Sequence, residues 1–100
     1  MTYLDDSVRT MIEKTVDSMM KNPKVTEETL RFILKKLGIE QNLETALSFI
    51  AGTMYGVSDC FYTLRYNRLM NVIERKELIE LMNRRAFKIR EALAYTRIEE

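Results

Sequence analysis

Apolar residues recur three and four positions apart along most of this 100-residue chain, the spacing of one face of an α-helix. Turn signals at Pro23, Gly38 and Asn71 divide the pattern into four stretches. The first stretch begins at Asp5 or Asp6, because either carboxylate can cap a helix N-terminus. The sequence therefore predicts an all-α fold of four helices.

The second predicted helix has Thr26 as its N-cap, with Val25 and Leu30 packing together across the first turn. The third begins at Asn42 and keeps an apolar residue close to every 3.5 positions for about three heptads. We expect this third helix to bury one stripe: Leu43, Leu47, Ile50, Met54, Val57, Phe61 and Leu64.

The boundary between the third and fourth helices carries the weakest signal. Asn71 with Glu74 predicts a helix start, and hence a break near residues 68–71. The alternative is one very long helix through residues 67–72, because no glycine or proline interrupts this region. The fourth helix is predicted to turn Leu78, Met82, Ala86, Ile89 and Leu93 inward and Glu77, Glu80, Arg84, Lys88 and Glu91 outward.

Short connections between these helices predict an up-and-down bundle of four helices, two shorter ones followed by a long antiparallel hairpin. The length fits one domain over residues 1–100. Because the hairpin is longer than the first two helices, we expect part of it to stay uncovered within the chain. An uncovered part would need a partner.

The segment from Thr45 to Leu64 is unusual because Asp59 is its only charged residue, whereas 31% of the whole chain is charged. Small residues recur there every four positions, which places them in one row on a helix: Ser48, Gly52, Gly56 and Cys60. Two mid-helix glycines cost about 1 kcal/mol each relative to alanine, so a close helix contact is expected to compensate. The partner helix can belong to the same chain or to a second chain. The predicted interaction residues are Ser48, Phe49, Gly52, Met54, Gly56, Cys60 and Phe61.

A polar group lies beside this row, at Tyr55, Asp59, Tyr62 and Tyr66. A buried carboxylate needs a partner, so Asp59 is expected to accept hydrogen bonds from tyrosine hydroxyls or to pair with an arginine of the last helix. One carboxylate without a second acid or a histidine is a poor catalyst. The group therefore predicts a polar network that fixes the register of the helices.

The net charge of +1 gives no overall attraction to nucleic acid. The basic residues of the C-terminal part nevertheless leave an alternative function, weak nucleic-acid binding through Arg65, Arg68, Arg84, Arg85 and Lys88. Glutamates intervene, and the basic residues are spread around the helices rather than gathered on one side. This alternative predicts binding that weakens steeply with salt.

The chain has no histidine and one cysteine, so imidazole ligands, catalytic pairs with histidine and an intramolecular disulfide are excluded. We expect no catalytic residue, no metal, no cofactor and no small-molecule substrate. The lone cysteine and the lack of a secretory apolar run at the N-terminus indicate the cytoplasm. Asp59 and the hydroxyl side chains argue against a membrane span over Thr45–Leu64.

Together these patterns predict a small helical protein–protein interaction or scaffolding module. Its expected partner is a protein, in the first place a second copy of itself in a homodimer. The third helix is expected to supply the contact through Gly52 and Gly56. No motif identifies a pathway.

Overall fold

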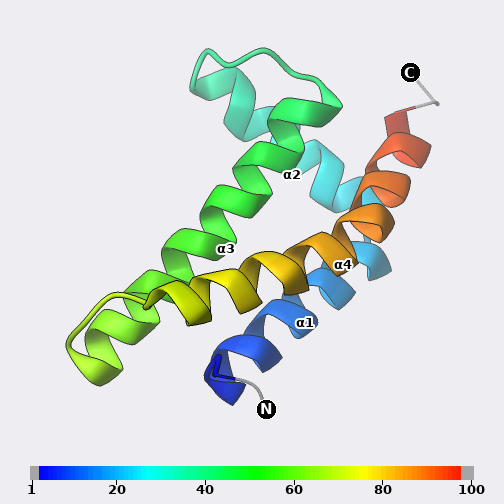
Figure 1. Cartoon of the computed structure of the whole chain (residues 1–100). Coiled ribbons are helices and arrows are strands. Elements are labelled where there is room, and N and C mark those ends of the chain that lie inside the picture. The colour runs from blue at the N-terminus through cyan, green and yellow to red at the C-terminus, as the bar shows by residue number, and fades with distance from the viewer. Residues whose placement is uncertain (1–2, 98–100) are drawn as a thin grey trace.

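The computed structural model describes residues 3–97, and the part it describes is a bundle of four α-helices without strands (Figure 1). The helices are α1 (Asp6–Lys21), α2 (Pro23–Lys36), α3 (Leu43–Tyr66) and α4 (Val72–Arg97). The predicted all-α class is confirmed, as is the order of two shorter helices followed by two long ones.

Ion pairs at both ends show that α3 and α4 form an antiparallel hairpin. Near the end of α4, Arg90 Nη1 lies 2.8 Å from Glu44 Oε1 in the first turn of α3. Near the start of α4, Arg75 Nη2 lies 3.9 Å from Asp59 Oδ1 in the C-terminal third of α3. The two helices are therefore joined near both ends of the hairpin.

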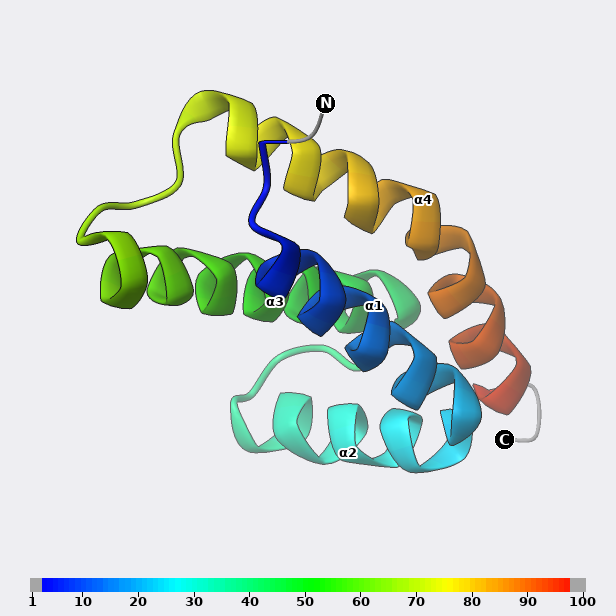
Figure 2. The ribbon, with the colours of Figure 1, turned by 90° about the horizontal axis from the view of Figure 1, so that it is seen from below.

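The first helix runs in the same direction as α4. Arg9 pairs with Glu77 and Asp17 pairs with Arg85, and both pairs are 68 residues apart, as expected for parallel helices in register. The helix directions do not simply alternate, because α2 crosses α3 steeply instead of reversing along it (Figure 1). Seen from below, α1 lies in front of the hairpin and α2 lies along its side (Figure 2).

The predicted start of α2 at Thr26 is wrong, since the helix begins at Pro23. Proline fits the first helical position because its fixed φ suits a helix and its missing N–H would be unpaired there. The Thr26 hydroxyl instead donates to the carbonyl of Asn22, at 3.0 Å. Val25 is 61% exposed and belongs to the first turn of α2, so it does not precede the N-cap as the predicted contact with Leu30 requires.

Local signals set the next two helix ends as predicted. Gly38, with φ of 70°, follows the end of α2, and the N–H of Ile39 donates to the carbonyl of Leu34 at 2.9 Å. This left-handed position favours glycine because it has no Cβ. Asn42 caps α3 reciprocally with Thr45, the Thr45 N–H donating to Asn42 Oδ1 at 2.9 Å.

The predicted break between α3 and α4 is confirmed, and the alternative of one continuous helix is wrong. Asn67 ends α3 in the left-handed conformation, with φ of 57°. Asn71 and Glu74 then cap α4 reciprocally, each backbone N–H donating to the other's side chain at 2.8 Å. These two asparagines replace the glycine or proline that a sharp turn usually contains.

The core contains apolar side chains from all four helices, including Val8, Ile12, Leu34, Met54, Leu78 and Leu93. In α3 the buried row follows four-residue steps: Ile50, Met54, Ser58 and Tyr62. The predicted 3.5-residue stripe is wrong at Val57, which is 45% exposed, and at Leu64, which is 83% exposed. A 3.5-residue stripe suits helices that coil around one another, whereas α3 crosses its neighbours at an angle along a four-residue ridge.

Candidate protein–protein interface

Gly52 and Gly56 lie on the side of α3 that faces away from the core. Each is two positions from buried Met54, which is about 200° around a helix. A Cβ atom added to either glycine would meet no atom within 4 Å. Of the two alternatives left open by the sequence, the contact within one chain is therefore wrong for the part of the chain that the structure describes.

The glycines belong to a wider uncharged surface of α3, which we call the open face. It consists of Ser48, Phe49, Gly52, Thr53, Gly56, Val57, Cys60, Thr63 and Leu64, and all except half-buried Phe49 are exposed. Among the predicted interaction residues, Met54 is buried and Phe61 is half-buried, so these two support the surface from inside. No helix within residues 3–97 combines the length and the apolar character that crossing a bilayer requires.

Beside the N-terminal half of the open face, α1, α2 and α3 enclose a groove of about 300 Å³, which we call the three-helix groove. None of its lining residues is charged: Thr15, Met19, Val25, Thr26, Thr29, Leu30, Ile33, Phe49, Ile50, Thr53 and Met54. Phe49 and Thr53 belong to both surfaces, so the groove is continuous with the open face.

The threonines of the three-helix groove have no hydroxyl proton left to donate to a ligand. The hydroxyls of Thr15, Thr29 and Thr53 each donate to the carbonyl four residues earlier in their own helix, at 2.7, 2.8 and 2.8 Å. The Thr26 hydroxyl is used in the same way. Since a hydroxyl has one proton to donate, the groove offers methyl and methylene groups, and it suits an apolar side chain.

Two of the four predicted network residues hold the N-terminus of α1. The Asp5 N–H donates to the Tyr62 hydroxyl at 2.7 Å, and the Tyr66 hydroxyl donates to the Asp5 carboxylate. Burial raises the pKa of Tyr62, so its hydroxyl stays protonated. Asp5 is also the N-cap of α1, as predicted, accepting from the Ser7 N–H at 2.8 Å.

The other two network residues face α4. Asp59 Oδ1 accepts from the Met70 N–H at 3.1 Å and pairs with Arg75 of α4, one of the two partners that the sequence predicts. The Arg75 guanidinium lies 5.9 Å from the centre of the Tyr55 ring. The structure thus divides the predicted network into two clusters, Tyr62 with Tyr66 and Tyr55 with Asp59.

Glu74 is the most deeply buried carboxylate described, with 5% of the residue exposed. Arg68 Nη1 and Nη2 donate to its two oxygens at 2.7 and 3.0 Å, and the Asn71 N–H donates at 2.8 Å. The Arg68 hydrogen bonds lower the pKa of Glu74, because they favour the charged carboxylate over the opposing effect of burial.

Glu77 ties the N-terminal segment to α4, so its predicted outward orientation is wrong. Its two oxygens accept from the N–H groups of Tyr3 and Leu4 at 2.6 and 3.0 Å, and Arg9 Nη2 lies 3.2 Å away. Burial alone would raise the pKa of Glu77, but these donors outweigh it and the pKa is lowered.

We expect the protein to lose stability in acid because of Asp5, Glu74 and Glu77. Hydrogen bonding by Tyr66 lowers the pKa of Asp5, so all three folded-state pKa values lie below the unfolded ones. Such groups stabilise the fold above their unfolded pKa values, near 4, and this contribution is lost as the pH falls through the folded values. Urea midpoints should be constant from pH 7 to about pH 5 and then decrease. An unchanged urea midpoint at pH 3 would contradict this prediction. Glu28→Gln, on the exposed side of α2, is the control and should leave the dependence of the midpoint on pH unchanged.

Three of the basic residues in the nucleic-acid alternative pair with carboxylates of the same chain. Arg68 binds Glu74, Arg85 binds Glu13 and Asp17, and Arg65 lies 3.9 Å from Asp5. Arg84 and Lys88 are exposed on α4. A phosphate backbone would have to compete with these carboxylates, so the arrangement disfavours this alternative.

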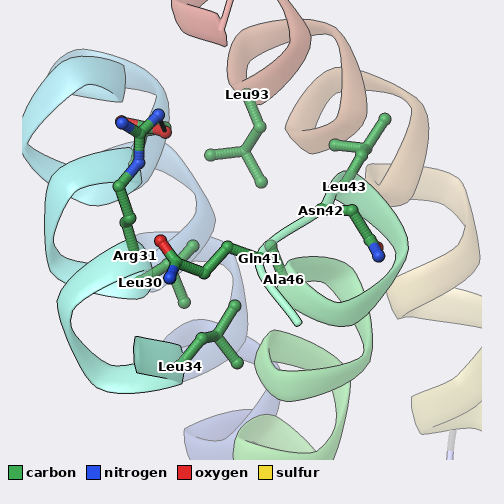
Figure 3. A pocket seen from close by; sticks show the side chains of 9 residues that line it. Leu30, Arg31, Leu34, Gln41, Asn42, Leu43, Ala46 and Leu93 are labelled. Atoms are coloured by element: carbon green, nitrogen blue, oxygen red, sulfur yellow. Dashed lines mark hydrogen bonds and ion pairs between the residues drawn. The ribbon is translucent and has the colours of Figure 1, made fainter. Parts of the chain in front are cut away.

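A smaller pocket of about 160 Å³ lies between the C-terminal part of α2 and the start of α3. Figure 3 shows Leu30, Leu34 and Leu93 pointing toward this space, with Gln41 beside them. At its rim, Glu27 and Arg31 form an ion pair with each other. The pocket is therefore lined by leucines, by this ion pair and by Asn42, whose side chain caps α3.

Comparison with known proteins gives no match: no family model fits the chain, and neither curated proteins nor solved structures include a significant relative.

Sequence reasoning found the small-residue row but missed two parts of the surface. The 3.5-residue spacing places Val57 and Leu64 in the core stripe, whereas the structure exposes both. The signal that could have distinguished them from core residues is the four-residue row through Ser58, which is the row that α3 buries. The three-helix groove was also missed, because it forms only where α1, α2 and α3 pack together, and no local sequence pattern shows that packing.

Proposed function

We propose that this protein is a helical protein–protein interaction module that forms a homodimer through the open face of α3, without catalysis of its own. The observation that supports this proposal is the position of Gly52 and Gly56, exposed in mid-helix with open space above them. Alanine at these positions would favour the isolated helix by about 1 kcal/mol each. A second helix pressing against the glycines would compensate for that cost.

The chemistry of the open face supports the same partner. It carries no charge, and it includes Val57 and Leu64, two exposed apolar side chains that water solvates poorly. A second copy brings the same uncharged surface, so no charge is left unpaired on either side. We place the module in the cytoplasm, because Cys60 is an exposed free thiol beside this contact and a reducing compartment would keep it reduced.

Replacing Gly56 with leucine tests the proposal. The space above Gly56 is open in one chain, so the variant should fold and melt at or above the temperature of the parent protein. The leucine would hold two α3 helices apart, and the sedimentation mass should fall from that of two chains to that of one. Gly56→Ala is the graded control, with a smaller effect. Equal masses for Gly56→Leu and the parent protein would refute the proposed contact.

A further inference from the structure

We infer that in this homodimer Leu64 of each copy fills the three-helix groove of the other. This inference depends on the proposed function and adds the arrangement of the two chains. The three-helix groove is lined only by uncharged side chains, and the threonine hydroxyls in it already donate within their own helices. An apolar side chain therefore suits this groove best.

The chain carries a suitable side chain on the same side of α3. Leu64 is 83% exposed, the largest exposed fraction among the large apolar side chains described. It follows Thr53 by eleven residues, which is close to three helical turns, so the two positions share one side about 16 Å apart. The groove beside Thr53 and the projecting Leu64 thus lie along one line on the helix.

This arrangement is self-complementary under two-fold symmetry. When two α3 helices cross in antiparallel orientation with the axis near Gly56 and Val57, Leu64 of one copy lies opposite the segment from Phe49 to Thr53 of the other. The same contact forms twice. The axis falls at Gly56, which has open space above it and allows the closest approach of the two backbones.

The lack of charge on the open face and the area of the expected contact both fit a second copy of this chain as the partner. None of the residues of the open face is charged, and Asp59, at its edge three residues after Gly56, pairs with Arg75 of the same chain, so its charge is already balanced. The contact would be a strip about 24 Å long and about 18 Å wide, which is the width of two helices. Such a strip buries roughly 900 Å² in total, counted over both copies. That area is smaller than the roughly 1,200–2,000 Å² of stable specific interfaces and is typical of weak, transient complexes, so we expect a dissociation constant in the micromolar range and no tighter.

Disulfide trapping tests the arrangement. Positions 53 and 60 of one helix are about 10 Å apart along its axis, too far for an intramolecular disulfide. In the inferred dimer, Cys60 of one copy lies beside position 53 of the other, so Thr53→Cys should form covalent dimers rapidly under mild oxidation. The parent protein, with Cys60 alone, should form few. Ser48→Cys is the matched control on the open face, about 18 Å from Cys60 along the helix, and efficient trapping of that variant would show a parallel arrangement and overturn the inference.

A charge placed on the projecting side chain gives a second test. Leu64→Glu should weaken dimerisation at least tenfold without loss of thermal stability, because this side chain is exposed in the single chain. Phe87→Glu, a matched change at a 70% exposed position on α4, should not weaken it. If Leu64→Glu dimerises normally while Gly56→Leu does not, this inference is wrong and the proposed function stands. A parent protein that is monomeric at about 200 µM, well above a micromolar dissociation constant, would overturn both.

Discussion

Replacing Leu78 with alanine should lower the free energy of unfolding by about 2–5 kcal/mol, the cost of a buried leucine truncation. Leu78 is fully buried and belongs to α4, which makes the most extensive contacts with the other three helices. Since small domains are stable by only about 5–15 kcal/mol, this one change should shift the urea midpoint strongly or leave the protein partly unfolded.

The neighbouring residue provides a matched control for Leu78. Ile79 is 53% exposed, so Ile79→Ala should change the free energy of unfolding by less than about 1 kcal/mol. Equal midpoints for the two variants would show that α4 does not pack in the register described.

Replacing Glu74 with alanine should cost about 2–3 kcal/mol at pH 7, because it removes charge-assisted hydrogen bonds and the reciprocal cap of α4. The carboxylate accepts from Arg68 and from the Asn71 N–H, and it is among the most buried polar groups described. The cost should shrink as the pH falls below about 4, because the unfolded chain then binds a proton at Glu74 that the folded protein, with its lowered pKa, binds less readily.

Urea titrations of Glu74→Ala and the parent protein at pH 7, 4 and 3 measure this effect. Glu80→Ala is the control, since Glu80 is an exposed glutamate on the same helix. A stability difference that stays constant over this range would mean that the charged form of Glu74 is not what holds the start of α4.

The sequence predicted those elements of the fold whose causes are local. Asn42 with Thr45, Asn71 with Glu74, and Gly38 each set a helix end through atoms within a few residues, and all three ends were predicted. The start of α2 was not, because Thr26 and Pro23 are both valid start signals and only the folded chain shows which one is used.

Long-range features could not be predicted from spacing. Glu77 reads as a surface residue in its own helix, yet its partners Tyr3 and Leu4 are more than 70 positions away. The small-residue row could be recognised because mid-helix glycines are costly whatever surrounds them. Whether a helix of the same chain covered that row depended on the crossing angle of α2 and α3, which no local pattern encodes.

The contacts that join the N-terminal segment to α4 have a consequence for how the chain folds. During synthesis α1 emerges first, and the residues that hold its start, Tyr62 and Glu77, emerge 57 to 74 positions later. Its apolar stripe therefore remains without its main covering helix until α4 has been synthesised. Contacts of such sequence separation slow folding relative to bundles closed by neighbouring helices. The first helix should accordingly be the last to become protected from hydrogen exchange in a refolding experiment.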